Sequence, residues 1–240
     1  MRINFIFLFS FLTVLSGCHK AGHPAGMAAL AILSDLTDTM PEVQSLDANK
    51  VVSQLPENWD LSTNGVSVQF RFITDRILNS VIEVKLEPLT EGSEYNEIDR
   101  QNVIDTFNSR LQTETGLIRK MPEGRNSSIV FSSLFNALNE LATYPKSVPR
   151  KLVLLSDCRE NSNLFNAYQD IEELKTNPGK LKTKIEKECP VKYSLSGISV
   201  IIVHQPASVA EDEIFDIVSK FISGILIEKG ATVKIQTSLN

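Results

Sequence analysis

Asp35, Thr37 and Thr39 carry oxygen atoms at alternating positions, directly after the apolar residues 28–34. Short acidic and hydroxyl side chains that follow a buried strand can aim several oxygen ligands at one point. A second carboxylate, Asp157, directly follows another apolar run at residues 151–156. Whether these side chains form one site depends on whether the two strands end at the same edge of a sheet.

Hydrophobic periodicity predicts the elements that would position these side chains. Continuous or alternating apolar patterns predict strands at residues 28–34, 66–74, 81–86, 151–156, 198–203 and 231–235. Helical spacing predicts helices at residues 41–55, 98–111, 127–141, 164–174, 181–187 and 212–228. Residues 113–126 are polar and predicted to be irregular, and 177–179 are predicted to form a turn.

This order predicts an α/β fold: a doubly wound, Rossmann-like, mostly parallel six-stranded sheet with helices on both faces. The gap at residues 75–80 has no room for a crossover helix, so the second and third strands should form an antiparallel hairpin at one edge. If the strand order is 3-2-1-4-5-6, the winding direction switches between the first and fourth strands. Asp35 and Asp157 would then lie side by side.

The segment Asp35-Leu36-Thr37-Asp38-Thr39 resembles the D-x-S/T-x-S/T signature of von Willebrand factor A-type (VWA) domains. The resemblance covers residues 28–235 and implies a metal-ion-dependent adhesion site, in which a carboxylate of a partner protein completes the coordination of a divalent cation. By this resemblance the ligands are Asp35, Thr37 and Thr39 from the first loop, Ser127 from the second and Asp157 from the third. Ser128 is nearly as good a choice for the second loop. Hard oxygen ligands favour Mg²⁺, with Ca²⁺ or Mn²⁺ as alternatives.

The sequence departs from the VWA pattern in two places: Cys158 follows Asp157 where the family usually has Gly, and the second-loop Thr is replaced by Ser. A metal-free structural or interaction lipoprotein is therefore one alternative. A phosphohydrolase of the haloacid dehalogenase type is another, but its D-x-D motif needs a carboxylate where this chain has Thr37. We predict a binding module and not an enzyme.

The N-terminus is predicted to be a targeting segment. Residues 1–17 combine Arg2 with an apolar stretch that is too short to span a membrane as a stable helix. The ending Leu15-Ser16-Gly17-Cys18 resembles a bacterial lipobox, which implies lipidation of Cys18. We expect residues 18–27 to be a tether and 28–240 the VWA-like domain, bound to the membrane through the lipid. No acidic run follows Cys18, which favours the outer membrane, facing the periplasm, within the cell envelope.

Two cysteines remain once Cys18 is lipidated. In an oxidising compartment Cys158 and Cys189 are expected to form a disulfide. A reactive thiol at Cys158, which ends a strand, is the alternative. His204 also ends a strand and is expected to be packed or surface-polar.

The charge of the chain bears on its partners. With 24 Lys and Arg against 29 Asp and Glu, the net charge is -5. No basic face is evident, so nucleic acid is not expected as a partner. The expected partner is a protein that offers a carboxylate.

Overall fold

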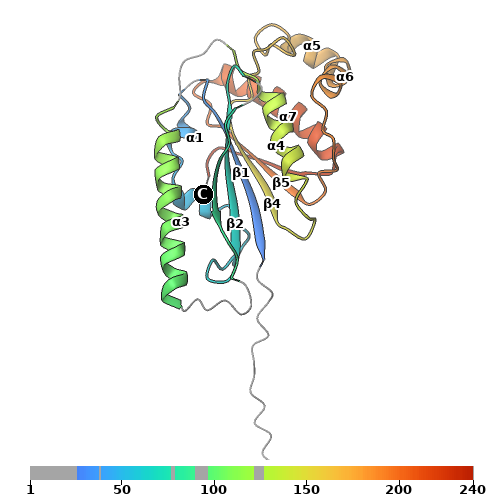
Figure 1. Cartoon of the computed structure of the whole chain (residues 1–240). Coiled ribbons are helices and arrows are strands. Elements are labelled where there is room, and N and C mark those ends of the chain that lie inside the picture. The colour runs from blue at the N-terminus through green and yellow to red at the C-terminus, as the bar shows by residue number, and fades with distance from the viewer. Residues whose placement is uncertain (1–25, 38, 77–78, 90–96, 122–126, 240) are drawn as a thin grey trace, which may run out of the picture.

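The computed structural model describes residues 26–37, 39–76, 79–89, 97–121 and 127–239. Its centre is one six-stranded sheet with the order β3-β2-β1-β4-β5-β6, shown in Figure 1. The strands are β1 (Met27–Asp35), β2 (Gly65–Ile73), β3 (Ile82–Leu86), β4 (Arg150–Leu155), β5 (Ile198–Val203) and β6 (Thr232–Gln236). Only the β2–β3 pair is antiparallel among these strands. The predicted fold class, strand order and edge hairpin are confirmed.

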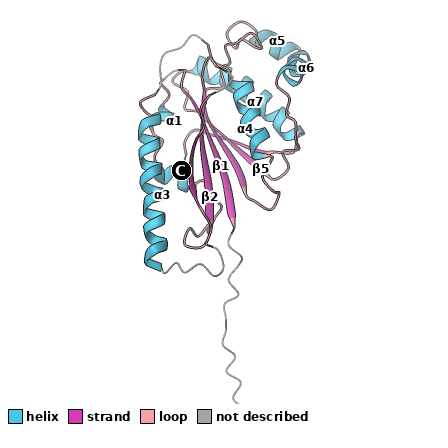
Figure 2. Cartoon of the chain, viewed as in Figure 1, coloured by secondary structure: helices cyan, strands magenta, loops and turns pink. Residues whose placement is uncertain are grey.

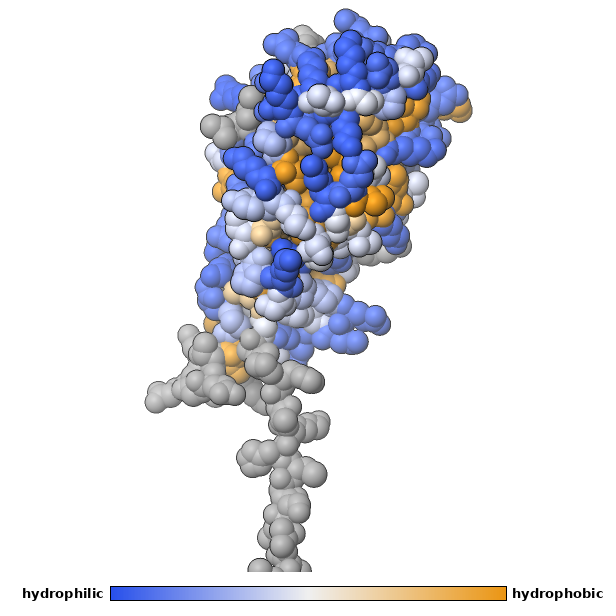
Figure 3. Space-filling view, turned by 90° about the vertical axis from the view of Figure 1, so that its right-hand side faces the viewer, coloured by the Kyte–Doolittle hydropathy of each residue, from blue (hydrophilic) through white to orange (hydrophobic). Residues whose placement is uncertain are grey.

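Helices cover both faces of the sheet, as Figures 1 and 2 show. The helices are α1 (Pro41–Gln44), α2 (Ala48–Val52), α3 (Glu97–Ile118), α4 (Val130–Leu141), α5 (Ile171–Thr176), α6 (Pro178–Glu188) and α7 (Val209–Glu228). One core cluster contains side chains of α4 to α7, and the other contains side chains of α1 to α3. Seen from the side of α4 and α7, the surface near the upper end of the molecule is mostly hydrophilic, with apolar residues showing between the polar ones (Figure 3).

Strand β1 lies at the middle of the sheet and contributes to both cores. Its side chains alternate between the faces because successive residues of a strand point in opposite directions. Ala29, Ala31 and Leu33 pack in the core on the α4 side, and Ala28, Leu30 and Ile32 pack in the core on the α3 side. A strand buried on both faces reads as a continuous apolar run, which explains the pattern at residues 28–34.

The prediction of one helix over residues 41–55 is wrong, because two short helices occupy this segment. Asp47 separates them: its Oδ1 accepts a hydrogen bond from the backbone N–H of Lys50 at 2.9 Å and caps α2. An N-cap residue has non-helical backbone angles, so a continuous helix cannot pass through it. Periodicity alone did not reveal this interruption.

Helix α3 is longer than predicted and extends through residues 113–118. The hydroxyl of Thr115 is buried and donates a hydrogen bond to the carbonyl of Leu111, four residues earlier, at 2.9 Å. Ile118 is fully buried at the end of the helix. Polar composition suggested an irregular segment here, but tertiary packing of its few apolar side chains overrides that local preference.

Other helix boundaries also differ from the predictions, including the start of α7 at Val209 in place of residue 212. The helix predicted over residues 164–174 is confined to α5, because Asn166 sits in a turn in which its N–H donates to Asp170 Oδ2 at 2.9 Å. Helix α6 already begins at Pro178, inside the predicted turn, and proline suits the first turn of a helix. Helix α4 begins at Val130 and not at residue 127, because Ser128 forms a β-bridge with Asn161.

Cys18 and the rest of the predicted targeting segment up to residue 25 lie outside the described residues. Within the ranges that the structure describes, no helix is both long enough and apolar enough to cross a membrane.

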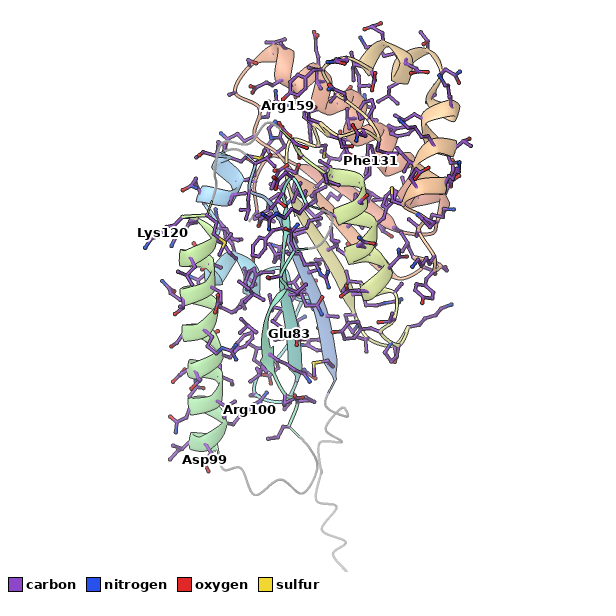
Figure 4. The ribbon with its side chains drawn as sticks, turned by 45° about the horizontal axis from the view of Figure 1, so that its top comes forward. Glu83, Asp99, Arg100, Lys120, Phe131 and Arg159 are labelled. Carbon is purple, nitrogen blue, oxygen red and sulfur yellow. The ribbon has the colours of Figure 1, made fainter. Side chains whose placement is uncertain are left out.

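Arg100 fixes the first turn of α3 to the neighbouring loops, and Figure 4 labels it at that end of the helix. Its buried guanidinium donates hydrogen bonds to the backbone carbonyls of Leu61, Ser62, Asn64 and Glu87 at 2.6–3.2 Å. We expect Arg100→Ala to lower the free energy of unfolding by about 3 kcal/mol, because several carbonyls lose their donors. Urea denaturation would measure this loss.

Arg100→Lys should recover little of that stability, since a lysine ammonium cannot reproduce the planar fork of donors. Arg110→Ala is the matched control, because exposed Arg110 makes a single 3.3 Å hydrogen bond to the carbonyl of Glu83. A loss at Arg100 no larger than the loss at Arg110 would contradict this account.

Candidate functional site

Asp35 lies at the end of the central strand, where β2 and β4 flank it on either side. Its carboxylate is fully buried. Oδ1 accepts hydrogen bonds from the backbone N–H of Thr37 at 3.0 Å and from the Thr37 hydroxyl at 2.6 Å. Oδ2 accepts one from the hydroxyl of Ser156, at the end of β4, at 2.9 Å. The ends of β1 and β4 therefore meet at this carboxylate, as the predicted strand order required.

Burial raises the pKa of Asp35 from 3.8 to about 6, because a carboxylate loses solvation in the protein interior. The hydrogen bonds from Thr37 and Ser156 oppose this rise, and the negative charge of Asp157 adds to it. The influence of Asp157 means that the two carboxylates lie close enough to repel each other. A cation bound between them would relieve this repulsion.

Asp157 is nearly buried and is engaged by Arg159. Its Oδ1 accepts a hydrogen bond from the backbone N–H of Arg159 at 2.9 Å. Its Oδ2 forms an ion pair with Nε of the Arg159 guanidinium. The guanidinium also lies 3.8 Å from Glu211 Oε1 and 5.7 Å from the ring centroid of Tyr168. Figure 4 shows Arg159 at the upper end of the sheet. No pattern in the sequence predicted a role for Arg159.

The segment before α4 supplies two candidate hydroxyls. The hydroxyl of Ser127 donates a hydrogen bond to the carbonyl of Asn161 at 2.9 Å. Ser128 is buried, and its hydroxyl has no hydrogen-bond partner among the described residues. A buried polar atom without a partner is costly, so it points to a missing ligand or water. This observation favours Ser128 over Ser127 as the second-loop ligand.

The other residues of the first loop differ in exposure. Thr37 is nearly buried beside Asp35, Thr39 is exposed, and Asp38 lies outside the described residues. The hydroxyl hydrogen of Thr37 points to Asp35, so its oxygen lone pairs face away from that carboxylate. Thr37 is therefore a suitable neutral ligand for a hard cation.

The donor set fits a hard divalent cation that depends on hydroxyl and water oxygens. Asp35, Asp157, Thr37 and Ser128 supply carboxylate and hydroxyl oxygens, which Mg²⁺ and Mn²⁺ accept. Among the described residues, no group of three or more His, Cys, Asp or Glu side chains is placed to hold a metal ion. A cation here would therefore carry few protein charges in its coordination shell.

Glu160 is another buried carboxylate near this edge, and the sequence pattern did not predict its role. Its Oε2 accepts a hydrogen bond from the backbone N–H of Phe131 at 2.7 Å, so it caps α4 from a distant loop. The hydroxyl of Ser162 donates to Oε1. Burial raises the pKa of Glu160 from 4.5 to about 7, against these hydrogen bonds. No local cap-type pattern could have revealed a cap that comes from 29 residues away.

Glu42 and His204 form a further buried pair. Nδ1 of His204 lies 2.9 Å from Oε1 of Glu42, which joins α1 to the end of β5. Glu42 Oε2 and His204 Nε2 are both buried without a partner among the described residues. The expectation that His204 is packed or surface-polar is consistent with its burial. The pairing with Glu42 was not predicted, because an acidic residue in the first turn of a helix is common and gives no sign of a distant partner.

The predicted disulfide is not formed in the structure, since Cys158 and Cys189 are both free thiols. Cys158 is fully buried, and its sulfur lies 3.8 Å from the carbonyl of Ser156. Cys189 is half-buried and directs its sulfur to the carbonyl of Ile185 at 3.3 Å. Burial raises the pKa of both thiols, well above 9.0 for Cys158 and to about 11 for Cys189. Protonated thiols are weak nucleophiles, which also argues against a reactive thiol at Cys158.

No protein-family model and no curated protein matches the sequence. Among solved structures, the SpRpn10 VWA domain is similar over 88% of this chain and 88% of its own, at 12% identity and a TM-score of 0.33. The conserved hypothetical protein BatB from Bacteroides thetaiotaomicron is similar over 89% of this chain and 91% of its own, at 14% identity and a TM-score of 0.36. The D319A mutant of the PilB minor pilin from Streptococcus sanguinis is similar over 91% of this chain and 58% of its own, at 12% identity and a TM-score of 0.43.

The fold is of the VWA type. This conclusion rests on the sheet itself, with its strand order, its antiparallel edge strand β3 and its helices on both faces. The strand order and the edge hairpin agree with those predicted from the sequence.

The raised pKa of Glu160 predicts a pH-dependent stability. Because the folded state binds this proton more tightly than the unfolded state, the contribution of Glu160 is complete below pH 4.5 and is lost as the pH rises to about 7. The size of this loss is on the order of 3 kcal/mol. In Glu160→Gln the loss should be absent, so the variant should gain stability relative to the wild type between pH 4.5 and 7.

Urea denaturation across this pH range would measure the free energy of unfolding of both proteins. The altered hydrogen bonds of the variant add an offset that is the same at every pH, so they do not change the predicted difference in pH dependence. Asp35 is present in both proteins, and its charge adds to the raised pKa of Glu160 in the wild type alone. Glu172→Gln is the control, since Glu172 is exposed on α5. Parallel pH profiles for the wild type and Glu160→Gln would contradict the prediction.

Proposed function

We propose that this protein is a protein-interaction module that binds a carboxylate of its partner through a divalent cation at the carboxyl ends of β1 and β4. The observation that carries the proposal is the convergence of Asp35, Thr37, Ser156 and Asp157 at this edge. In open α/β sheets, ligands bind beyond the carboxyl ends of strands where the winding direction switches. This edge is such a switch point, because the strand order runs outward from β1 and β4 in opposite directions.

Each residue has a distinct part in the proposed site. Asp35 and Asp157 provide the negative field that attracts a cation, and Thr37 and Ser128 provide neutral hydroxyl ligands. Mg²⁺ is the ion that we expect, with Mn²⁺ or Ca²⁺ as substitutes. When bound, the ion would supply the positive charge that a partner's carboxylate needs. Because few protein charges neutralise the ion, its attraction for one more carboxylate would remain strong.

We further propose that the domain is held at the cell envelope by a lipid on Cys18. The lipobox-like sequence at residues 15–18 and the apolar stretch before it support this proposal. Strand β1 begins at Met27, so only a short tether would separate the lipid from the folded domain. The proposed partner would therefore be a protein that acts close to the membrane, and we propose the periplasmic face of the outer membrane as the place.

The proposal does not include catalysis. A haloacid dehalogenase-type phosphohydrolase would use Asp35 as a nucleophile and a second carboxylate two residues later. Thr37 occupies that position, and its hydroxyl donates a hydrogen bond to Asp35 Oδ1. Both oxygens of Asp35 already accept hydrogen bonds, which lowers their nucleophilicity. We expect no hydrolysis of a generic phosphate ester by the purified protein.

Isothermal titration of the mature protein with Mn²⁺ would test the cation site. Asp35→Asn and Asp157→Asn should each weaken binding at least tenfold, by an amount on the order of 1.4 kcal/mol or more. Asp60→Asn is the control, because Asp60 is an exposed carboxylate in the turn before β2. Absence of binding by the wild type, or equal binding by the double variant Asp35→Asn with Asp157→Asn, would refute the cation site.

A pull-down from envelope extract would test the interaction. Partner capture by the wild type in Mg²⁺ should fall with EDTA and with Asp35→Asn, because the cation bridges the two proteins. Capture that survives both changes would instead support the alternative of a metal-free interaction lipoprotein. The captured protein should in turn lose binding when its own contacting carboxylate is replaced by an amide.

A further inference from the structure

Arg159 is placed to compete with a cation for Asp157. Its guanidinium forms an ion pair with Asp157 Oδ2, and its backbone N–H occupies Oδ1. Asp157 thus has a positive charge on one oxygen and a hydrogen bond on the other. The guanidinium disfavours a divalent cation at Oδ2, because the two positive charges would repel each other there. Arginine cannot relieve the conflict by losing a proton, since it stays charged in proteins.

A second carboxylate, that of Glu211, lies beside the guanidinium of Arg159. Glu211 lies in the first turn of α7, and its Oε1 is 3.8 Å from Nη2 of Arg159. Its other oxygen accepts a hydrogen bond from the backbone N–H of Ala207 at 2.9 Å, and its own N–H donates to the hydroxyl of Ser208 at 3.2 Å. This capping arrangement fixes Glu211 in place. A small movement of the guanidinium would therefore exchange Asp157 for a carboxylate that is already in position.

Tyr168 keeps Arg159 in this region during such an exchange. The centre of the guanidinium lies 5.7 Å from the ring centroid, which is within the range of a cation–π interaction. Tyr168 is largely exposed, so the guanidinium does not have to enter the core to move. The side chain of Arg159 is itself 19% exposed. Asp157 and Glu211 both lie within 4 Å of the guanidinium as it stands, so an exchange between them needs only a small movement of this side chain.

We propose that Arg159 is an internal gate of the cation site: it neutralises Asp157 when no cation is bound and shifts to Glu211 when a cation binds. This inference rests on the proposed cation site. Arg159 is not a ligand of the cation, and it acts through Asp157 and Glu211. The gate makes cation affinity depend on the balance between two ion pairs that lie on different elements, the loop after β4 and the start of α7.

A double-mutant cycle on Mn²⁺ affinity tests the gate. Isothermal titration would compare the wild type, Arg159→Gln, Glu211→Gln and the double variant. Arg159→Gln should bind Mn²⁺ about tenfold more tightly, because Asp157 no longer has an internal partner. Glu211→Gln should bind about threefold more weakly, because the displaced guanidinium loses its second carboxylate. In the background of Arg159→Gln, the change at Glu211 should have no effect, because the guanidinium that Glu211 receives is absent.

Two features separate the gate from a general effect of charge. If Glu211 acted on the cation directly through its field, its replacement would weaken binding equally in both backgrounds, and that outcome would overturn the gate. Arg110→Gln removes one positive charge from exposed α3 and should leave the affinity unchanged. If Arg110→Gln increased the affinity for Mn²⁺ as much as Arg159→Gln does, that result would also overturn the gate. The Glu211→Gln variant can retain the capping hydrogen bonds, and thermal melting would verify that α7 stays folded.

The outcomes distinguish this inference from the function on which it rests. Equal affinity of the wild type and Arg159→Gln overturns the gate and leaves the cation site standing. Absence of Mn²⁺ binding by both proteins overturns the gate together with the cation site.

Discussion

The burial of one carboxylate, Asp35, at the end of the central strand is the constraint on which the functional edge depends. A buried carboxylate is unfavourable unless hydrogen bonds and nearby positive charge compensate it. Thr37 and Ser156 provide the hydrogen bonds, from the loops after β1 and β4. The negative charge of Asp157 adds to the cost of burying Asp35, and the guanidinium of Arg159 is paired with Asp157. The cation that we propose would supply further positive charge beside Asp35.

Several polar groups around this edge are buried and paired over long sequence distances. Glu160 caps α4, Glu42 pairs with His204, and Arg159 links Asp157 to the first turn of α7. Each pair joins a loop at the carboxyl ends of the strands to a helix. Together they hold the loops around Asp35 against α1, α4 and α7.

The site predictions were limited by local information. The pattern of Asp35, Thr37 and Thr39 was visible because the three residues follow one strand, and Asp157 followed from the predicted strand order. Glu160, Glu42 and Arg159 carried no local signal, since each acquires its role from a partner that only the folded chain brings near. The disulfide between Cys158 and Cys189 was expected from the compartment and the number of cysteines, and the structure has both sulfurs directed to nearby backbone carbonyls instead.

The sequence by itself determined the class of the fold and the antiparallel edge hairpin. These follow from hydrophobic periodicity and from the short β2–β3 connection, which are local properties of the chain. The strand order that brings the ends of β1 and β4 together was a condition in the sequence analysis, and the structure meets it. Only the tertiary structure decided where α3 ends, that α1 and α2 are separate, and which second-loop hydroxyl is left without a partner. Those features depend on the burial of Ile118 and Ser128 and on the N-cap hydrogen bond of Asp47. Burial is a property of the packed molecule, so periodicity cannot specify it.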